Sequence, residues 1–139
     1  ADCPMVDPTI IDEVIGVYNL GDFDYVSNCN ERTYPDGLDV EIFSISALRE
    51  ADENVISSFG REHVTPYIRG VYFEYERGNF KIKQVKFLTD LSHIRWTVDT
   101  YKDLEVVREL ISNLPEKYSW LDALSFATKK PYLLGLPVE

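Results

Sequence analysis

The sequence predicts an α/β fold built on a mixed β-sheet. Helical and strand-like segments alternate along the chain, as they do where helices pack on a sheet. The short strands in the middle of the chain follow one another as in a hairpin, which favours a sheet with both antiparallel and parallel pairs. No internal repeat, low-complexity tract or linker divides the 139 residues, so we expect a single domain.

The first element is a helix that begins after Asp7, because aspartate is a good cap and Pro8 suits the first helical position. Its apolar residues recur at helical spacing, at Ile10, Ile11, Val14, Ile15 and Tyr18. Residues 19–21 end it. Residues 23–28 follow as a short strand, and the polar run 30–37 closes with a Pro-Asp-Gly turn signal.

The middle of the chain predicts a strand and then a helix. Residues 38–43 alternate between apolar and acidic side chains, as in a half-exposed strand. Ser46 is expected to cap a helix that continues to Gly60. Residues 61–68 contain Pro66, which predicts a loop or a broken helical turn.

The second half predicts two strands and two helices. Residues 80–87 form a strand whose alternation changes phase at Gln84, as a β-bulge would cause. Residues 94–98 form another strand, after which Thr100 and Asp103 make a variant of the capping box. A last helix over residues 119–128 is ended by Pro131.

Composition excludes several classes of function. The net charge of −10 disfavours binding to nucleic acid, whose phosphates it would repel. No apolar run approaches the ~20 residues that span a bilayer, so we expect no contact with a membrane. Two cysteines make no disulfide scaffold, and a cytoplasmic location is expected. The sequence also contains no GxG, CxxC, HExxH or GxSxG motif.

Two aspartates stand where predicted strands end. Asp2 opens the chain just before Cys3-Pro4, and Asp99 follows the strand at residues 94–98. Ligands bind at the carboxyl ends of strands in open α/β sheets, and two carboxylates there suit a hard cation such as Mg²⁺. The alternative is that each aspartate only caps a helix or forms a turn, and spacing alone favours this alternative.

Other polar residues are weaker candidates. The loop over residues 32–37 could hold an anionic or polyhydroxyl ligand. It offers a cation at Arg32 and a tight turn at Asp36 and Gly37. Asp39 and Glu41 share one face of the following strand. The alternatives are an ordinary surface loop and a solvated strand face.

Glu62 and His63 are also candidates, because they follow Arg61 in a run of three ionisable residues. The alternative is a surface ion pair beside a structural histidine. The lysines at 81, 83 and 86 are better explained as protection of an edge strand.

Taken in order, five runs give the chain a specific resemblance. They are residues 1–8 (ADCPMVDP), 25–28 (YVSN), 32–43 (RTYPDGLDVEIF), 61–68 (REHVTPYI) and 95–104 (RWTVDTYKDL). The chain resembles the cytidylyltransferase family, in particular its branch of spore coat polysaccharide biosynthesis proteins. That branch is related to the 3-deoxy-manno-octulosonate and acylneuraminate cytidylyltransferases.

The resemblance implies a Rossmann-like nucleotidyltransferase fold and transfer of CMP from CTP to a sugar hydroxyl, with release of pyrophosphate. It implies that Asp2 and Asp99 hold Mg²⁺ and act in catalysis. On the acceptor side it implies sugar contacts from Asp36, Gly37, Asp39, Glu41, Glu62 and His63, with Arg32 facing a carboxylate or phosphate. We expect an acidic or amino sugar as acceptor. A homodimer is also expected, for which Tyr72, Phe73 and Tyr75 could line the interface; the alternative is that they are buried in the core.

The sequence departs from the family in one respect. The nucleotide-binding pattern R-x-x-S-x-R-x-P-x-K is not present in the 139 residues. We therefore expect the chain to be a partial domain, the C-terminal portion with the acceptor and metal sites, and to be inactive alone. The alternative is a non-catalytic binding module that keeps the family's sheet without its nucleotide loop.

Overall fold

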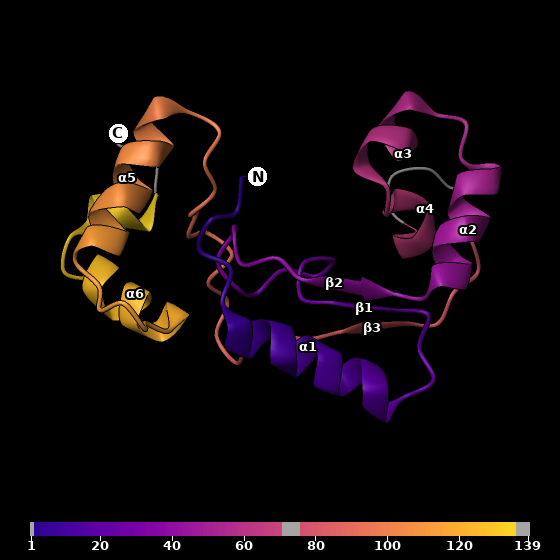
Figure 1. The fold of residues 1–139 in the computed structure, drawn as a ribbon, viewed down its shortest axis with the longest axis horizontal. Coiled ribbons are helices and arrows are strands. Elements are labelled where there is room, and N and C mark those ends of the chain that lie inside the picture. Colours follow the sequence, from indigo (N-terminus) through magenta and orange to yellow (C-terminus); the bar gives the residue numbers. More distant parts are fainter. Residues whose placement is uncertain (1, 71–75, 136–139) are drawn as a thin grey trace.

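A computed structural model describes residues 2–70 and 76–135. The three expected interface aromatics, Tyr72, Phe73 and Tyr75, lie outside these residues. Figure 1 shows a central sheet with α1 (Pro8–Leu20) alongside it and a group of helices at each end. One group holds α2 (Ile45–Asn54), α3 (Ser58–His63) and α4 (Pro66–Arg69), and the other holds α5 (Tyr101–Ser112) and α6 (Trp120–Ala127).

The sheet is mixed, as the sequence predicts. Its three strands are β1 (Tyr25–Ser27), β2 (Glu41–Phe43) and β3 (Ile82–Gln84), in the order β2-β1-β3. The β1–β2 pair is antiparallel and the β1–β3 pair is parallel. All three residues of β1 are buried, because α1 packs beside this central strand.

The strand predicted at residues 38–43 is shorter than expected because a side chain replaces part of the ladder. The Asn28 amide donates to the Leu38 carbonyl at 2.8 Å and accepts from the Val40 N–H at 2.8 Å. Asn28 is itself buried, so these bonds satisfy polar groups that water cannot reach. Asp39 therefore lies just before β2, whereas Glu41 is its first residue and pairs with Ser27.

The predicted bulge at Gln84 is wrong. Gln84 pairs in register with Ser27, and the next N–H, that of Val85, donates to the Ser27 carbonyl at 2.8 Å. The ladder therefore runs on without an extra residue. The change of alternation arises because Ile82 is 39% exposed whereas Val85 is buried.

The prediction of one helix from Ser46 to Gly60 is also wrong, because α2 ends at Asn54. Glu76 explains the break: its carboxylate accepts from the N–H groups of Ile56 and Ser57, at 2.8 and 2.9 Å, and from the Ser57 hydroxyl. These hydrogen bonds hold the pKa of Glu76 below its ordinary value. Ser57 then caps α3, so a residue 20 positions away fixes the link between the two helices.

The true cap of α2 is Ser44, whose hydroxyl accepts from the Ala47 N–H at 3.1 Å. We expect Ser44→Ala to lower the free energy of unfolding by about 1 kcal/mol, since it leaves a helix N–H without its acceptor. Ser46→Ala is the matched control and should change it by no more than a few tenths of a kcal/mol. Urea unfolding of both variants measures this. Equal losses would contradict the assignment of Ser44.

The C-terminal helices follow the sequence prediction closely. Both α5 and α6 begin with a complete capping box, Thr100 with Asp103 and Ser119 with Asp122. A short 3₁₀ helix, η1 (Pro131–Leu134), then returns to the core. There the Trp96 indole donates to the Leu133 carbonyl at 2.9 Å.

Two hydrophobic clusters hold the fold together. The larger joins α1, α5 and α6 around the buried Trp96, and the smaller joins β1 to α2 and α4. No helix in the described part of the chain combines the length and apolarity that crossing a membrane requires.

Candidate active site

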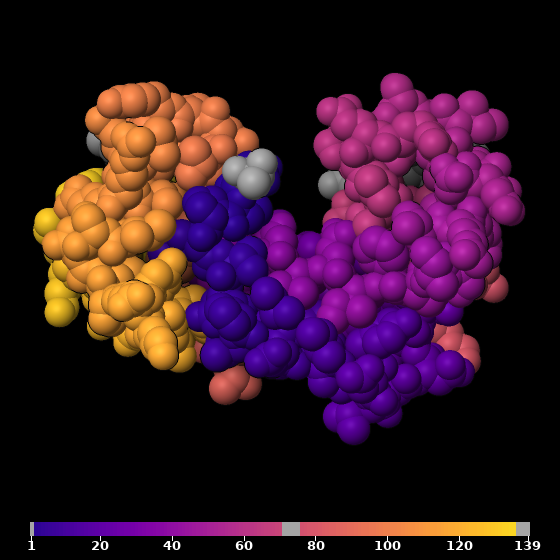
Figure 2. Space-filling view, viewed as in Figure 1, coloured from indigo at the N-terminus to yellow at the C-terminus, as the bar shows by residue number. Residues whose placement is uncertain are grey.

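A hollow separates the two helical groups. Figure 2 shows it as a deep notch, with the α5–α6 group and the N-terminal segment on one side and the α2–α4 group on the other. In Figure 1, β2 runs across the base of the same region.

Three extended segments meet at one side of the hollow. The Val98 N–H donates to the Asp2 carbonyl at 2.8 Å, and the Trp96 N–H donates to the Asp36 carbonyl at 2.8 Å. A parallel bridge pairs Asp36 with Arg95. The predicted strand at residues 94–98 is thus extended, and Asp36 and Asp2 bond to the same edge of it, with the Asp36 N–H also donating to the Ile94 carbonyl at 2.8 Å. On the other edge the Arg95 N–H donates to the Leu134 carbonyl at 3.0 Å, so separate hydrogen bonds replace a full ladder. This strand brings the segments of Asp2, Asp36 and Asp99 together.

Alternation along this segment separates a core face from a polar face. Trp96 is fully buried in the larger cluster, and Val98 packs against that cluster. Residues one position away must therefore point to the other side. Arg95 and Asp99 confirm this, because they form an ion pair with each other. Thr97 lies between them in sequence, on the same side.

Arg95 forms ion pairs with two carboxylates on this polar face. It pairs with Asp99, and its Nη1 donates to Asp103 Oδ1 at 2.8 Å. Partial burial alone would raise the pKa of Asp103. Hydrogen bonds from the Asp99 and Thr100 N–H groups and from Arg95 outweigh burial and lower that pKa to about 2.

A second group of charges surrounds Arg32. The Arg32 guanidinium donates two hydrogen bonds to the Asp39 carboxylate, one of them from Nη2 to Oδ2 at 2.8 Å. Its Nη1 also lies 3.3 Å from Asp36 Oδ1. The Cys3 thiol interacts electrostatically both with Asp2 and with the aspartates of this group. Burial raises the pKa of the Cys3 thiol to about 11, with further contributions from the carboxylates of Asp2, Asp39 and Asp36. Asp2, Asp36 and Asp39 therefore share one acidic region.

A third group lies around Glu41 of β2. Its carboxylate Oε1 is 3.4 Å from Nη1 of Arg69 and 3.5 Å from the Cys29 sulfur. Burial raises the pKa of the Cys29 thiol to about 12, and the charges of Glu41 and Asp39 raise it further. The polar residues thus form a row, from Asp99 and Arg95 through Arg32 and Asp39 to Glu41 and Arg69.

Glu62 and His63 do not join this row. Both are exposed on α3, and the His63 ring lies 4.3 Å from the Phe59 ring. Among the described residues, neither forms a hydrogen bond or ion pair with Asp39 or Glu41. Their predicted contact with the acceptor remains a prediction.

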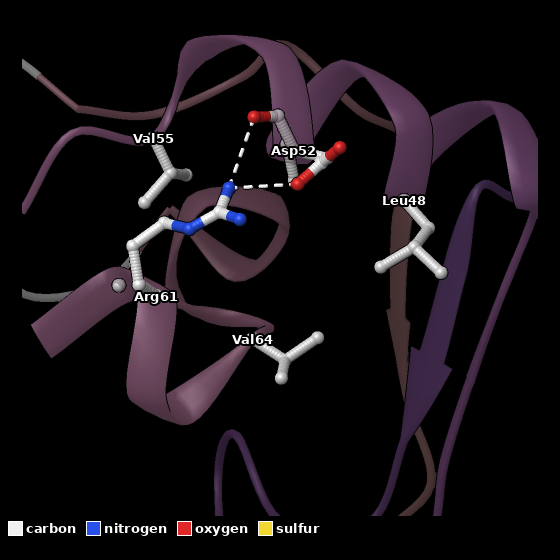
Figure 3. Close-up of a pocket in the computed structure, with 7 residues that line it drawn as sticks. Leu48, Asp52, Val55, Arg61 and Val64 are labelled. Carbon is white, nitrogen blue, oxygen red and sulfur yellow. Dashed lines mark hydrogen bonds and ion pairs between the residues drawn. The ribbon is translucent and has the colours of Figure 1, made fainter. Parts of the chain in front are cut away.

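A small pocket lies between α2 and α3, close to these two residues. Figure 3 shows its apolar side chains facing Arg61, which donates to the Asp52 carbonyl at 3.0 Å and to its carboxylate at 2.7 Å. The pocket holds about 140 Å³. Its lining consists of Leu48, Ala51, Asp52, Val55, Gly60, Arg61 and Val64. The charges of Arg61 and Asp52 pair with each other, and the other residues that line the pocket are apolar.

Several site residues were not predicted from the sequence. These are Cys29, Arg69, Arg95, Thr97 and Asp103. For Arg95 and Thr97 a signal existed, since alternation with the buried Trp96 and Val98 places them beside Asp99. Arg69 had no such signal, because its contact with Glu41 joins residues 28 positions apart.

The residues on the polar face suit Mg²⁺, although no three His, Cys, Asp or Glu side chains converge within the described part of the chain. Magnesium in nucleotide enzymes needs only one or two carboxylates, since waters and phosphates complete its shell. Asp2 and Asp99 are exposed and lie on neighbouring segments. Thr97 is 8% exposed, and its buried hydroxyl has no hydrogen-bond partner among the described residues.

The overall architecture is a nucleotidyltransferase-like α/β fold. The structure is similar to that of a cytidylyltransferase from Leptospira borgpetersenii serovar Hardjo-bovis, with a TM-score of 0.85 and 30% identity. The similarity covers 99% of this chain and 57% of that one. The mixed α/β fold expected from sequence is thereby confirmed.

One curated relative also matches. The chain is 37% identical, over 112 residues, to the uncharacterised protein MJ1063 of Methanocaldococcus jannaschii. That match covers 78% of this chain and 42% of the relative. No protein-family model matches the chain. The chain thus spans between two fifths and three fifths of the length of the two proteins it resembles.

Proposed function

We propose that the chain forms the metal-binding and acceptor-binding part of a cytidylyltransferase. The reaction is transfer of CMP from CTP to a sugar hydroxyl, with release of pyrophosphate, in the synthesis of a polysaccharide or glycoconjugate. The observation that supports it most is the series of paired charges that runs from Asp99 through Arg32 to Glu41, in a fold similar to that of a cytidylyltransferase. A cytoplasmic location and a homodimer are parts of the same proposal.

Asp2 and Asp99 are the proposed metal ligands. A bound Mg²⁺ would neutralise the triphosphate and stabilise charge that develops on it during transfer. Arg95 holds one oxygen of Asp99, which fixes the orientation of that carboxylate. Without a cation, a chain of net charge −10 would repel a nucleoside triphosphate.

The other carboxylates are the proposed acceptor contacts. Asp36 and Asp39 are locked by Arg32, which makes them rigid hydrogen-bond acceptors for sugar hydroxyls. Gly37 allows the turn that places them there, and Glu41 continues the row. Arg32 itself is already paired with two carboxylates, Asp39 and Asp36, so its single charge is compensated before an anion arrives.

We expect Asp99→Asn to weaken binding of Mn²⁺, used as a probe for Mg²⁺, by more than about tenfold. The amide removes a charged ligand, and changes even to outer-shell partners cost ten- to a hundredfold. Titration followed by electron paramagnetic resonance measures free Mn²⁺. Asp52→Asn, on the opposite side of the hollow, is the control for lost charge and should bind as the unaltered chain does. Equal Mn²⁺ affinity in all three proteins would contradict the proposal that Asp99 is a metal ligand.

The same protein can be tested for turnover. The sequence lacks the family's nucleotide-binding pattern, so we expect this chain to bind Mn²⁺ yet to release no pyrophosphate from CTP and acidic sugars. A coupled pyrophosphate assay measures the second part. Release by the chain alone would show that it already holds a complete nucleotide site.

A further inference from the structure

Asp103 accepts more hydrogen bonds than the cap of a helix requires. It closes the capping box of α5, where its Oδ2 accepts from the Thr100 N–H at 2.8 Å. The same oxygen accepts from the Asp99 N–H at 3.1 Å, and Oδ1 accepts from Arg95 Nη1 at 2.8 Å. Asp103 is thus bonded both to the backbone of Asp99 and to the arginine that pairs with the Asp99 carboxylate.

The start of α6 shows what the cap alone requires. Asp122 closes the same kind of capping box with Ser119, whose N–H donates to Asp122 Oδ2 at 2.8 Å and whose hydroxyl donates to it at 2.9 Å. Within residues 2–70 and 76–135, the Asp122 carboxylate has no partner outside this box. Helix capping therefore does not explain the bonds from Asp103 to Arg95 and to the Asp99 N–H.

The consequence of these bonds is that two carboxylates share the Arg95 guanidinium. Nη1 donates to Asp103, and Nη2 donates to Asp99 Oδ2. Two donors of one guanidinium can instead hold both oxygens of one carboxylate, as Arg32 holds Asp39. Because Asp103 occupies Nη1, Arg95 engages only one oxygen of Asp99. The other oxygen, Oδ1, has no hydrogen bond or ion pair to any residue that the structure describes.

We propose that Asp103 is a positioning residue of the metal site, which keeps half of the Arg95 guanidinium away from Asp99 and so leaves Asp99 Oδ1 free for the cation. This inference rests on the proposed function, because it takes Asp99 as a metal ligand. The Asp99 side chain is 56% exposed, so a hydrated cation can reach the free oxygen. Without Asp103, Arg95 would close on both oxygens of Asp99 and compete with the metal.

The first test is the affinity for Mn²⁺, measured by electron paramagnetic resonance. Asp103→Asn keeps an oxygen for the capping box but loses the charge that holds Arg95. We expect it to weaken Mn²⁺ binding about tenfold, which is the lower end of what changes to outer-shell partners cost. Asp122→Asn makes the same change in the matching box of α6 and should bind Mn²⁺ as the unaltered chain does. Unchanged affinity in Asp103→Asn, or an equal loss in both variants, would overturn the inference.

A second substitution separates the capture of Asp99 by Arg95 from the simple loss of a negative charge. Arg95→Lys, added to Asp103→Asn, keeps every charge of that variant but removes the planar fork, because lysine carries one compact ammonium group. We expect this double variant to recover most of the lost Mn²⁺ affinity. An affinity as low as that of Asp103→Asn alone would show that the loss comes from charge, and would overturn the inference.

The two proposals fail in different ways. If Asp99→Asn binds Mn²⁺ as the unaltered chain does, the proposed metal site is wrong, and the inference about Asp103 is wrong with it. If Asp99→Asn weakens Mn²⁺ binding but Asp103→Asn does not, the metal site is supported and only the positioning role of Asp103 is wrong.

Discussion

Replacing Asp7 with alanine is expected to lower the free energy of unfolding by about 3 kcal/mol. Asp7 is buried, and its Oδ1 accepts from the Thr9 N–H at 2.7 Å and the Thr9 hydroxyl at 2.6 Å, which caps α1. Its Oδ2 accepts from the N–H of Trp120, the first residue of α6, at 2.6 Å. Loss of a cap costs about 1 kcal/mol, and an orphaned buried N–H about 1–3 kcal/mol more.

Urea unfolding followed by circular dichroism measures this loss. The control is Asp122→Ala, which removes an exposed capping-box aspartate from the start of α6 and should cost no more than about 1 kcal/mol. Asp7 bonds to a residue 113 positions away in the chain, whereas Asp122 acts within one turn. Equal losses in the two variants would show that the link between α1 and α6 contributes nothing.

Asp7 also shows which parts of the structure the sequence could predict. Its role as cap of α1 was readable, because an aspartate before a proline and an apolar helical pattern act through local geometry. The second bond, to Trp120, was not readable, because nothing near either residue signals the other. The same holds for Glu76, which ends α2 from 20 residues away and made the prediction of one long helix wrong.

The candidate site shows the same division between local features, which the sequence signals, and contacts between distant residues, which it does not. The strand-to-helix turn was enough to nominate Asp99, and the loop signal was enough to nominate Asp36 and Gly37, whose roles remain predictions. The pairing of Arg32 with Asp39, rather than with a ligand, depends on how the loop folds back over seven residues. The contact between Arg69 and Glu41, which joins the end of α4 to the start of β2, depends on tertiary packing in the same way. A sequence pattern shows which charges are present but not which of them neutralise each other.

Gly37 carries the second large effect, because neither its backbone conformation nor its surroundings accept a side chain. Its φ is +107°, which L-residues rarely adopt. A Cβ at this position would lie 2.8 Å from the Trp96 carbonyl carbon and 3.0 Å from the Thr97 nitrogen. Backbone strain and the close approach each cost about 1–3 kcal/mol, so we expect Gly37→Ala to lower the free energy of unfolding by about 3 kcal/mol.

The same substitution should disturb the metal site from a distance. Relief of the clash requires the Gly37 backbone to move away from residues 96–97, and Asp36 pairs with Arg95 in the same bridge. Arg95 in turn holds Asp99, so we expect Gly37→Ala to weaken Mn²⁺ binding several-fold under conditions where the variant is still folded.

Gly16→Ala is the matched control for this substitution. It lies inside α1 with nothing within 4 Å of the added Cβ, so it should raise stability by about 0.5–1 kcal/mol and leave Mn²⁺ binding unchanged. Denaturant unfolding and Mn²⁺ titration of both variants measure the two effects. If Gly37→Ala lost stability but kept full Mn²⁺ affinity, Asp99 would hold its position independently of the Asp36–Arg95 bridge.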